Sequence, residues 1–585
     1  MKGKTKKMAA LLMTSTLVVA AGCGGGGTTK TADAPAKSSD TGTETTTTGA
    51  DNAAATVSTD PITFTFFGGD ASPNWNNMQD AVGKKITEKT GVSLNAEFAV
   101  SGTDQQKIAL MIASGEYPQI IFPKGETSKL VEAGAMVDLT DLIDKYAPNI
   151  KKIYGPYMNR LRYSKDDPSI YTIPTNSMVD NTYFDAGGGF ELQLDVLKEL
   201  GYPEIRTTED FEKALKDYYA KHPTIDGQPT IPLLLNADDW KIMITVTNPA
   251  VYATGGPDDG EFYIDPETYE AKLHYKRPEE KEYFRWLNHM YNTGLLDKET
   301  FTQKNDQYLA KIASGRVLGL IDQNWDYGEA ENSLKSAGKY ERTYGHFPVT
   351  LSEEYKDHSF VDIGNGSGYG VGFTTAMKEE DQIRAIQFLD WMASDEGQIL
   401  NNWGIEGEQY TMENGKRVIP QDVQDRKNND NANFTKETGI GMYAPVTVRY
   451  GDGVKDSTDN YYTTNYPEQI TANYSEPMKE ALKAYKATTW KDLFPGKDEF
   501  PVKAWGAAYN LPSPSSPDFT VPFQKSQDIV RKAIPAAIVA TPDQFEGIYD
   551  QMLTDLEGSD IPKMEAMYTE LIKNTVDTWG GTEAK

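Results

Sequence analysis

The chain has 585 residues, of which 38% are hydrophobic, 11% aromatic and 25% charged, and its formal charge is −28. This acidic balance argues against binding to nucleic acid, which needs a basic patch, and against charge-driven binding to anionic lipid. The stretch from Pro61 to the C-terminus is long enough for more than one hydrophobic core.

The N-terminus has the pattern of a secretory signal peptide, which we expect to occupy residues 1–22. Lysines precede the uncharged, largely apolar run Met8–Ala21, which is too short to cross a bilayer as a helix because that requires ~20 residues. Cys23 follows directly and is the only cysteine of the sequence, so it has no intrachain disulfide partner. Its context resembles the bacterial lipobox, with Ala20 where leucine is usual. The resemblance implies that Cys23 is lipidated.

Residues 23–60 are predicted to form a flexible tether. They contain Gly24–Gly27 and many threonine, serine and alanine residues, with Val57 as the one large aliphatic side chain. Such a segment cannot bury enough apolar surface to offset its chain entropy. We therefore expect the folded body to be held at the extracytoplasmic face of a cell membrane by the lipid on Cys23.

The first part of the body alternates predicted strands with predicted helices. Residues 62–67, 92–100 and 119–122 have strand character, and residues 77–90, 103–114 and 127–133 have helical character. This alternation predicts an α/β fold with a mainly parallel sheet and helices on both faces.

Helical patterns dominate the rest of the chain. Strands are predicted at 317–321 and 369–373, and the Asn-, Asp- and Tyr-rich region 420–470 is predicted to be an irregular loop. The predicted helices are residues 192–200, 208–222, 278–292, 379–393, 476–487, 542–556 and 561–578.

Motifs of catalysis are missing from the sequence. The five histidines are scattered, and neither a His-Glu-x-x-His motif, a phosphate-binding Gly-x-x-x-x-Gly-Lys-Ser/Thr loop nor a Gly-x-Ser-x-Gly elbow occurs. We therefore expect a protein that is not an enzyme and that has no cofactor and no catalytic metal.

Six blocks of sequence, in consistent order between about residues 62 and 410, resemble extracellular solute-binding proteins of family 1. This is the maltose-binding-protein-like superfamily, and the similarity is to the large lipoproteins of Gram-positive ABC transporters. Residues after about 420 match the family poorly. The six blocks are Phe66–Gly69 with Lys84–Val92, Ala113–Leu142, Tyr171–Pro174, Leu197–Leu215, Ile312–Trp325 and Ile386–Tyr410.

The resemblance implies the type II periplasmic-binding-protein-like fold, in which two lobes are joined by a hinge that the chain crosses more than once. Lobe 1 would comprise residues 61–175 with about 350–410 returning to it, and lobe 2 residues 176–349 with much of 411–585. Crossings would fall near 173–174, 347–360 and 409–420.

The function that the resemblance implies is that of a lipid-anchored substrate-binding subunit of an ABC importer. The protein would capture a carbohydrate, expected to be an oligosaccharide, between its lobes. It would deliver this ligand, as a monomer, to permease transmembrane subunits that work with a separate ATPase.

Candidate ligand-binding residues are those that suit a sugar and, except for Trp240, follow a predicted strand. A sugar offers a face of C–H groups to aromatic rings and a rim of hydroxyls to polar side chains. Trp325 is the first candidate, since the resemblance places a stacking tryptophan there, whereas Trp240 has suitable loop chemistry but no family counterpart. The full set is Trp325, Asn324, Trp240, Asp70, Trp75, Lys124 and Glu126.

Two other functions stay open at this stage. A lipid-anchored polysaccharide-degrading enzyme would need two carboxylates at ~5 to ~10 Å across one cleft. A peptide- or signal-binding receptor would use the same fold, and fold alone does not separate it from a carbohydrate-binding protein.

Overall fold

The computed structural model of the protein describes residues 58–100, 103–365, 368–558 and 560–580. The expected signal peptide, Cys23 and all but the last residues of the expected tether lie outside these ranges. Among the described residues, no helix combines the length and the apolar character that a membrane span requires.

One sheet of the described chain has the strand order β2-β1-β3-β13-β4. β1 pairs in parallel with both β2 and β3, whereas β13 is antiparallel to β3 and to β4. The expectation of a mainly parallel sheet therefore holds for the three N-terminal strands and is wrong for β4 and β13, because β13 returns from far along the chain to lie between β3 and β4. The strands are β1 (Ile62–Gly68), β2 (Val92–Phe98), β3 (Ile120–Phe122), β4 (Ile173–Pro174) and β13 (Gly370–Phe373).

A second sheet has the strand order β12-β5-β11-β8. Here β11 is parallel to β8 and antiparallel to β5, and β12 is antiparallel to β5. The parallel pair brings the carboxyl ends of β8 and β11 to the same edge of the sheet, with Leu234 opposite Leu320. The strands are β5 (Gly188–Gln193), β8 (Ile231–Leu234), β11 (Val317–Gln323) and β12 (Tyr344–Phe347).

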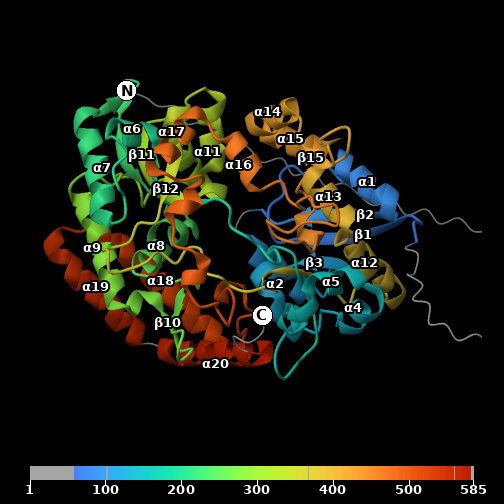
Figure 1. Ribbon diagram of the computed structural model, residues 1–585. Coiled ribbons are helices and arrows are strands. Elements are labelled where there is room, and N and C mark those ends of the chain that lie inside the picture. Colours follow the sequence, from blue (N-terminus) through green and yellow to red (C-terminus); the bar gives the residue numbers. More distant parts are fainter. Residues whose placement is uncertain (1–57, 101–102, 366–367, 559, 581–585) are drawn as a thin grey trace, which may run out of the picture. The chain divides into compact units, whose positions relative to one another are not determined.

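Each sheet carries its own hydrophobic core, and we call each sheet with its core a lobe (Figure 1). Lobe 1 includes Phe64, Ile120 and Val371, and lobe 2 includes Leu192 and Leu233. The helices of the lobe 1 region are α1 (Ala81–Thr90), α2 (Asp104–Ser114), α3 (Thr127–Glu132), α4 (Thr140–Tyr146), α5 (Pro148–Tyr154), α12 (Glu379–Met392), α13 (Asp395–Trp403), α14 (Gln421–Asn429) and α15 (Asn431–Thr438).

Lobe 2 contains most of the helices of the C-terminal region. In Figure 1, α18 and α19 lie beside α9, and these three helices are in contact. The remaining helices are α6 (Leu194–Glu199), α7 (Thr208–Lys221), α8 (Asn248–Ala253), α9 (Pro278–Asn292), α10 (Asn305–Ala313), α11 (Asn324–Ser336), α16 (Pro467–Asn473), α17 (Glu476–Tyr485), α18 (Pro517–Val539), α19 (Pro542–Glu557) and α20 (Ile561–Trp579). Two-stranded pairs join β6 (Thr224–Ile225) to β7 (Gln228–Pro229), β9 (Phe262–Ile264) to β10 (Ala271–Leu273) and β14 (Thr411–Glu413) to β15 (Lys416–Val418).

The chain passes between the two lobes three times. It leaves lobe 1 after β4 and enters lobe 2 at β5, and it returns between β12 and β13. The third passage lies between Val448, in the core of lobe 1, and Met478, in the core of lobe 2. It is later than the expected 409–420, because Phe434 and Tyr443 are buried in or against lobe 1.

Several local predictions agree with the structure, and others are wrong for identifiable reasons. α7 begins with a capping box in which Thr207 and Asp210 exchange hydrogen bonds, and the expected stripe of Phe211 and Leu215 is fully buried. The expected helix 192–200 starts later, at α6, since residues 188–193 pair as β5. The expected loop 420–470 contains α14, α15 and most of α16. α18 has no predicted counterpart.

Candidate binding site

Trp240 and Trp325 come together at the carboxyl edge of the second sheet. Trp325 is the second residue of α11, directly after β11, and Trp240 lies in the connection that follows β8. Because β8 and β11 are adjacent and parallel, both connections leave from the same edge. The two indole rings are stacked, with centroids 6.0 Å apart and planes 15° apart. Trp325 is nevertheless 59% exposed, so much of its ring is free to meet another molecule.

A cavity of about 740 Å³, which we call the tryptophan cavity, opens beside this pair. Its volume lies within the ~300 to ~1,000 Å³ typical of small-molecule sites. Residues from the first two passages between the lobes contribute to it, as does Tyr369 beside β13. Its aromatic lining residues are Tyr183, Trp240, Tyr252, Trp325, Phe360, Tyr369 and Tyr509, and its main polar ones are Asp185, Asn248, Asp258, Gln323 and Asn324.

The two carboxylates of the cavity are held in place by hydrogen bonds. Asp185 accepts from the Tyr474 hydroxyl at 2.6 Å and from two backbone N–H groups. Asp258 accepts from the Asn248 amide at 3.1 Å and from the Gly260 N–H at 2.8 Å. A carboxylate has about four acceptor positions, so each retains capacity for a ligand hydroxyl. Burial raises the pKa of Asp185 to about 6.

Two glycines allow the amide side chains of the cavity to lie against the backbone. A Cβ atom on Gly188 would stand 2.2 Å from Oε1 of Gln323, and one on Gly187 would stand 3.0 Å from Nδ2 of Asn324. Any larger residue at Gly188 would displace Gln323. The glycines just before and at the start of β5 thus leave room for both amides.

The wall behind the tryptophans is an unusual helical turn over a buried polar cluster. Met243–Thr247 form a π-helical turn, a feature often found at functional sites, and Met243 lines the cavity. Lys241, beside Trp240, forms an ion pair with Asp326. Deeper in the lobe, Asp322 accepts from the Tyr308 hydroxyl, and burial raises its pKa to about 7. This polar cluster holds the start of α11, and therefore Trp325, in place.

The four candidates on lobe 1 lie outside the tryptophan cavity. Asp70 and Lys124 follow the adjacent parallel strands β1 and β3 and form an ion pair with 2.7 Å between Oδ1 and Nζ. Glu126 is buried and pairs with Lys129 at 2.5 Å. Trp75 packs against Phe98 and Tyr443, with ring centroids 5.3 and 5.7 Å apart. Trp75 is thus packed against the core of lobe 1.

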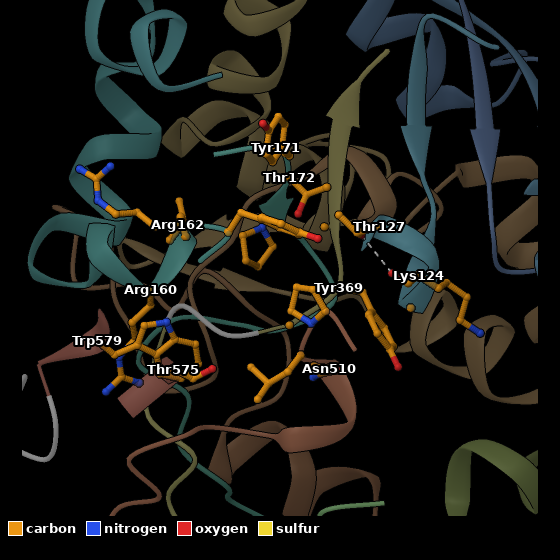
Figure 2. Close-up of a pocket in the computed structure, with 18 of the residues that line it drawn as sticks. Lys124, Thr127, Arg160, Arg162, Tyr171, Thr172, Tyr369, Asn510, Thr575 and Trp579 are labelled. Atoms are coloured by element: carbon orange, nitrogen blue, oxygen red, sulfur yellow. Dashed lines mark hydrogen bonds between the residues drawn. The ribbon is translucent and has the colours of Figure 1, made fainter. Parts of the chain in front are cut away.

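Lys124 lines a different, smaller cavity of about 80 Å³. Figure 2 shows Lys124 at one end of it and Arg160, Thr575 and Trp579 at the other, with Tyr369 between. The Arg160 guanidinium lies 5.1 Å from the centroid of the Trp579 ring, so this cavity is lined in part by a contact between lobe 1 and the end of α20. It is too small to hold a sugar.

Sequence reasoning missed several residues of the tryptophan cavity. Phe360 lies at the end of the expected crossing near 347–360, and Tyr183 lies a short way after the one near 173–174; their rings meet with centroids 5.2 Å apart. The expected hinge could therefore have suggested them. No sequence pattern indicated Tyr509 as a site residue, since it lies outside every predicted strand and helix. Tyr369 lies at the start of a predicted strand; it lines the cavity and donates from its hydroxyl to the Tyr509 carbonyl at 2.8 Å.

Within the ranges that the structure describes, no group of three or more histidine, cysteine or acidic side chains is arranged to hold a metal ion.

Residues 81–402 match the family model of bacterial extracellular solute-binding proteins. Lipoprotein LipO of Bacillus subtilis (strain 168) is 21% identical over 348 residues, which cover 57% of this chain and 64% of that protein. The fructooligosaccharide ABC transporter substrate-binding protein FusA of Streptococcus pneumoniae serotype 4 is 24% identical over 360 residues, covering 56% and 60%. The chain thus spans less than two thirds of the length of these curated relatives.

Solved structures share the fold over most of their length. The alginate-binding protein AlgQ2 superposes with a TM-score of 0.61 at 18% identity, covering 89% of this chain and 99% of that one. At this level of identity the likeness establishes the fold, which is the two-lobed type II fold with a hinge crossed more than once.

Proposed function

Because this chain belongs to the family of bacterial extracellular solute-binding proteins, we propose that it is the substrate-binding subunit of an ABC importer and that it captures a carbohydrate in the tryptophan cavity. The observation that carries the proposal is the stacked pair of Trp240 and Trp325, of which Trp325 is 59% exposed beside a cavity of about 740 Å³. The name of the relative FusA, a fructooligosaccharide ABC transporter substrate-binding protein, supports the same class of ligand.

The chemistry of the cavity suits a sugar better than a peptide or an apolar molecule. An exposed indole covers the C–H face of a sugar ring, as aromatic planes do when they remove apolar surface from water. Asp185, Asp258, Asn248 and Asn324 supply acceptors and donors around that face. Hydrogen bonds to carboxylates are the stronger kind, so the two aspartates favour hydroxyl-rich ligands.

The proposal is tested by a thermal-shift screen of residues 58–585 against neutral and acidic glycans, followed by calorimetric titration of the hits. A ligand that binds only the folded state raises the melting temperature. We expect a stoichiometric, saturable interaction that Trp325→Ala weakens. If no glycan shifts the melting temperature while a peptide library does, the carbohydrate assignment is wrong and the receptor alternative is favoured.

We propose further that the protein binds its ligand without chemical turnover. The family and the named relatives are substrate-binding proteins. Asp185 and Asp258 line one cavity, but both are already engaged in hydrogen bonds with the protein. Prolonged incubation with each glycan that binds should release no reducing ends. Cleavage that disappears in Asp185→Asn would instead identify a hydrolase.

The remaining parts of the proposal concern location and partners. Residues 1–22 would be removed on export, and Cys23 would carry a lipid that anchors a monomer at the outer face of the cell membrane. The name of the relative LipO supports a lipoprotein. Separate permease and ATPase subunits would complete the importer. Transport that continues in cells expressing this chain without an ABC permease would contradict that assignment.

A further inference from the structure

A second cavity, of about 620 Å³, lies along the length of α11 on the far side of Asn324. We call it the α11–α14 cavity, because α11 of lobe 2 forms one wall and α14, from the segment that returns to lobe 1, forms another, and these two helices are in contact. The third passage of the chain, around Tyr474, closes it. Apart from the residues that border both cavities, the proposed carbohydrate site described above does not use this space.

The two cavities are joined by shared residues. Asp185, Ala186 and Asn324 line both of them. Asn324 and Trp325 are consecutive at the start of α11, so one residue borders both cavities while the next presents its ring to the tryptophan cavity. The two cavities are therefore immediate neighbours, on either side of Asn324.

The second cavity follows α11 for most of its length. Asn324, Tyr327, Glu331 and Lys335 recur at the spacing of one helix face, and all four line it. From Asn324 to Lys335 the helix axis advances ~16 Å at 1.5 Å per residue. A single sugar ring is much shorter than this distance, whereas a chain of several rings can span it.

The walls of the second cavity are rich in neutral amides and poor in positive charge. Asn332, Asn428 and Asn473 each contribute a side chain that can donate and accept hydrogen bonds. Lys335 is the one lysine or arginine among the described lining residues of both cavities, and it is paired with Glu331 at 2.7 Å. His346 also lines the second cavity, but burial lowers its pKa to about 4. Asp425 and Glu476 add further negative charge. A polyanionic chain would meet repulsion here, and a neutral one would not.

Aromatic side chains also line the α11–α14 cavity. Tyr340 is 41% exposed and lines the cavity, as does the edge of the buried Trp490. The Nε1 of Trp490 and the hydroxyl of Tyr327 are buried without a hydrogen-bond partner in the described part of the chain. The second cavity therefore repeats the combination of aromatic rings and amides found in the tryptophan cavity.

We propose that the α11–α14 cavity is a second set of subsites for the same ligand, so that one neutral oligosaccharide stacks on Trp325, passes Asn324 and continues along α11 toward Lys335. This inference rests on the proposed carbohydrate function. It adds the class of ligand, which is a linear, uncharged chain longer than a disaccharide, and it assigns Asn332 and Lys335 to the recognition of its far end.

The experiment compares ligand lengths in two variants. The probes are malto-, manno- and fructo-oligosaccharides from disaccharide to hexasaccharide, with oligogalacturonates of equal length as the charged comparison, and affinity is measured by titration calorimetry. Asn332→Phe fills the second cavity, and Ser336→Phe, on the exposed end of the same helix and lining neither cavity, is the matched control.

In at least one neutral series, affinity should increase about tenfold or more from the disaccharide to the longer chains, which corresponds to ~1.4 kcal/mol. Asn332→Phe should remove this increase and leave disaccharide binding unchanged, Ser336→Phe should bind like the parent, and oligogalacturonates should bind more weakly than neutral chains at every length.

The outcomes separate the two proposals. Equal affinity for all lengths, or an Asn332→Phe variant that binds long chains like the parent, overturns the second set of subsites and leaves the tryptophan cavity as the site. Tighter binding of oligogalacturonates overturns the neutral ligand class. If the parent binds no member of any series, the proposed carbohydrate function fails, and this inference fails with it.

Discussion

Replacing Trp325 with alanine should weaken ligand binding and should cost less stability than the truncation of a core tryptophan. The side chain is 59% exposed, and because a tryptophan offers up to ~250 Å² of surface, roughly 150 Å² of it is available in the free protein. A sugar ring that covers about half of this removes ~75 Å² from water, which at ~25 cal/mol per Å² amounts to ~1.9 kcal/mol. The expected loss of affinity is therefore ~25-fold.

The cost to stability should be smaller than for a core tryptophan. The free protein loses the stack on Trp240, which contributes ~0.5 to ~1.5 kcal/mol beyond area burial, and the contacts of the buried part of the ring. A tryptophan buried in a core would instead cost ~3 to ~5 kcal/mol when truncated. Titration calorimetry and urea unfolding of the same preparation measure the two quantities independently.

Trp286→Ala is the matched control. Trp286 packs on Phe190 and Tyr283 in lobe 2 and lines neither cavity. Its truncation should lower the free energy of unfolding and leave the dissociation constant unchanged. The reasoning about Trp325 is refuted if its variant behaves like the control, with unchanged affinity and a large loss of stability.

Asp322→Asn should change the pH dependence of stability. Burial raises the pKa of Asp322 from 3.8 to about 7. Between these pH values the native state holds a proton that the unfolded chain releases. The contribution of Asp322 to the free energy of unfolding therefore falls as pH rises. In urea unfolding, the free energy of unfolding of Asp322→Asn should increase relative to that of the parent as pH rises through this window. A difference between the two proteins that does not change with pH would contradict this. Lys503→Met should cost ~3 to ~5 kcal/mol near neutral pH, because it leaves Asp259 as an uncompensated buried charge. Part of the loss should be recovered in acid, since burial raises the pKa of Asp259 to about 6. A variant as stable as the parent would show that the pair is dispensable. Cys23→Ser should leave unfolding unchanged and release the protein from membranes, and retention after a high-salt wash would exclude the lipid anchor.

The parts of the fold that could be predicted are those with a local signal. The strand β1 and the helices α7 and α9 have clear patterns of buried residues, and their predicted bounds are close to the observed ones. α14 was missed because Gln424 is its one buried residue, so it has no apolar stripe. α18 was missed because Pro522 and Pro535 lie inside it, and proline removes a helical hydrogen bond.

The candidate site was predictable residue by residue but not as an arrangement. Trp325 follows a recognisable strand, and Trp240 follows a short apolar run. Their contact depends on β8 and β11 being neighbours, which no local pattern encodes. In the same way, Asp70 and Lys124 on lobe 1 form their ion pair because β1 and β3, which precede them, are neighbours in the first sheet. The sequence could suggest four polar or aromatic residues there, but it could not reveal that an ion pair and core packing already occupy them.

The position of β13 between β3 and β4 has a consequence for how the chain folds during synthesis. Ile121 pairs with Gly372, a separation of about 250 residues, and such distant pairings form slowly. A chain released after β12 would hold every strand of the second sheet, yet β3 and β4 would still lack the partner that joins them. Unpaired strand edges of this kind invite aggregation. Chains truncated before β13 should therefore accumulate as insoluble material, and the full chain must be protected from association until β13 has paired.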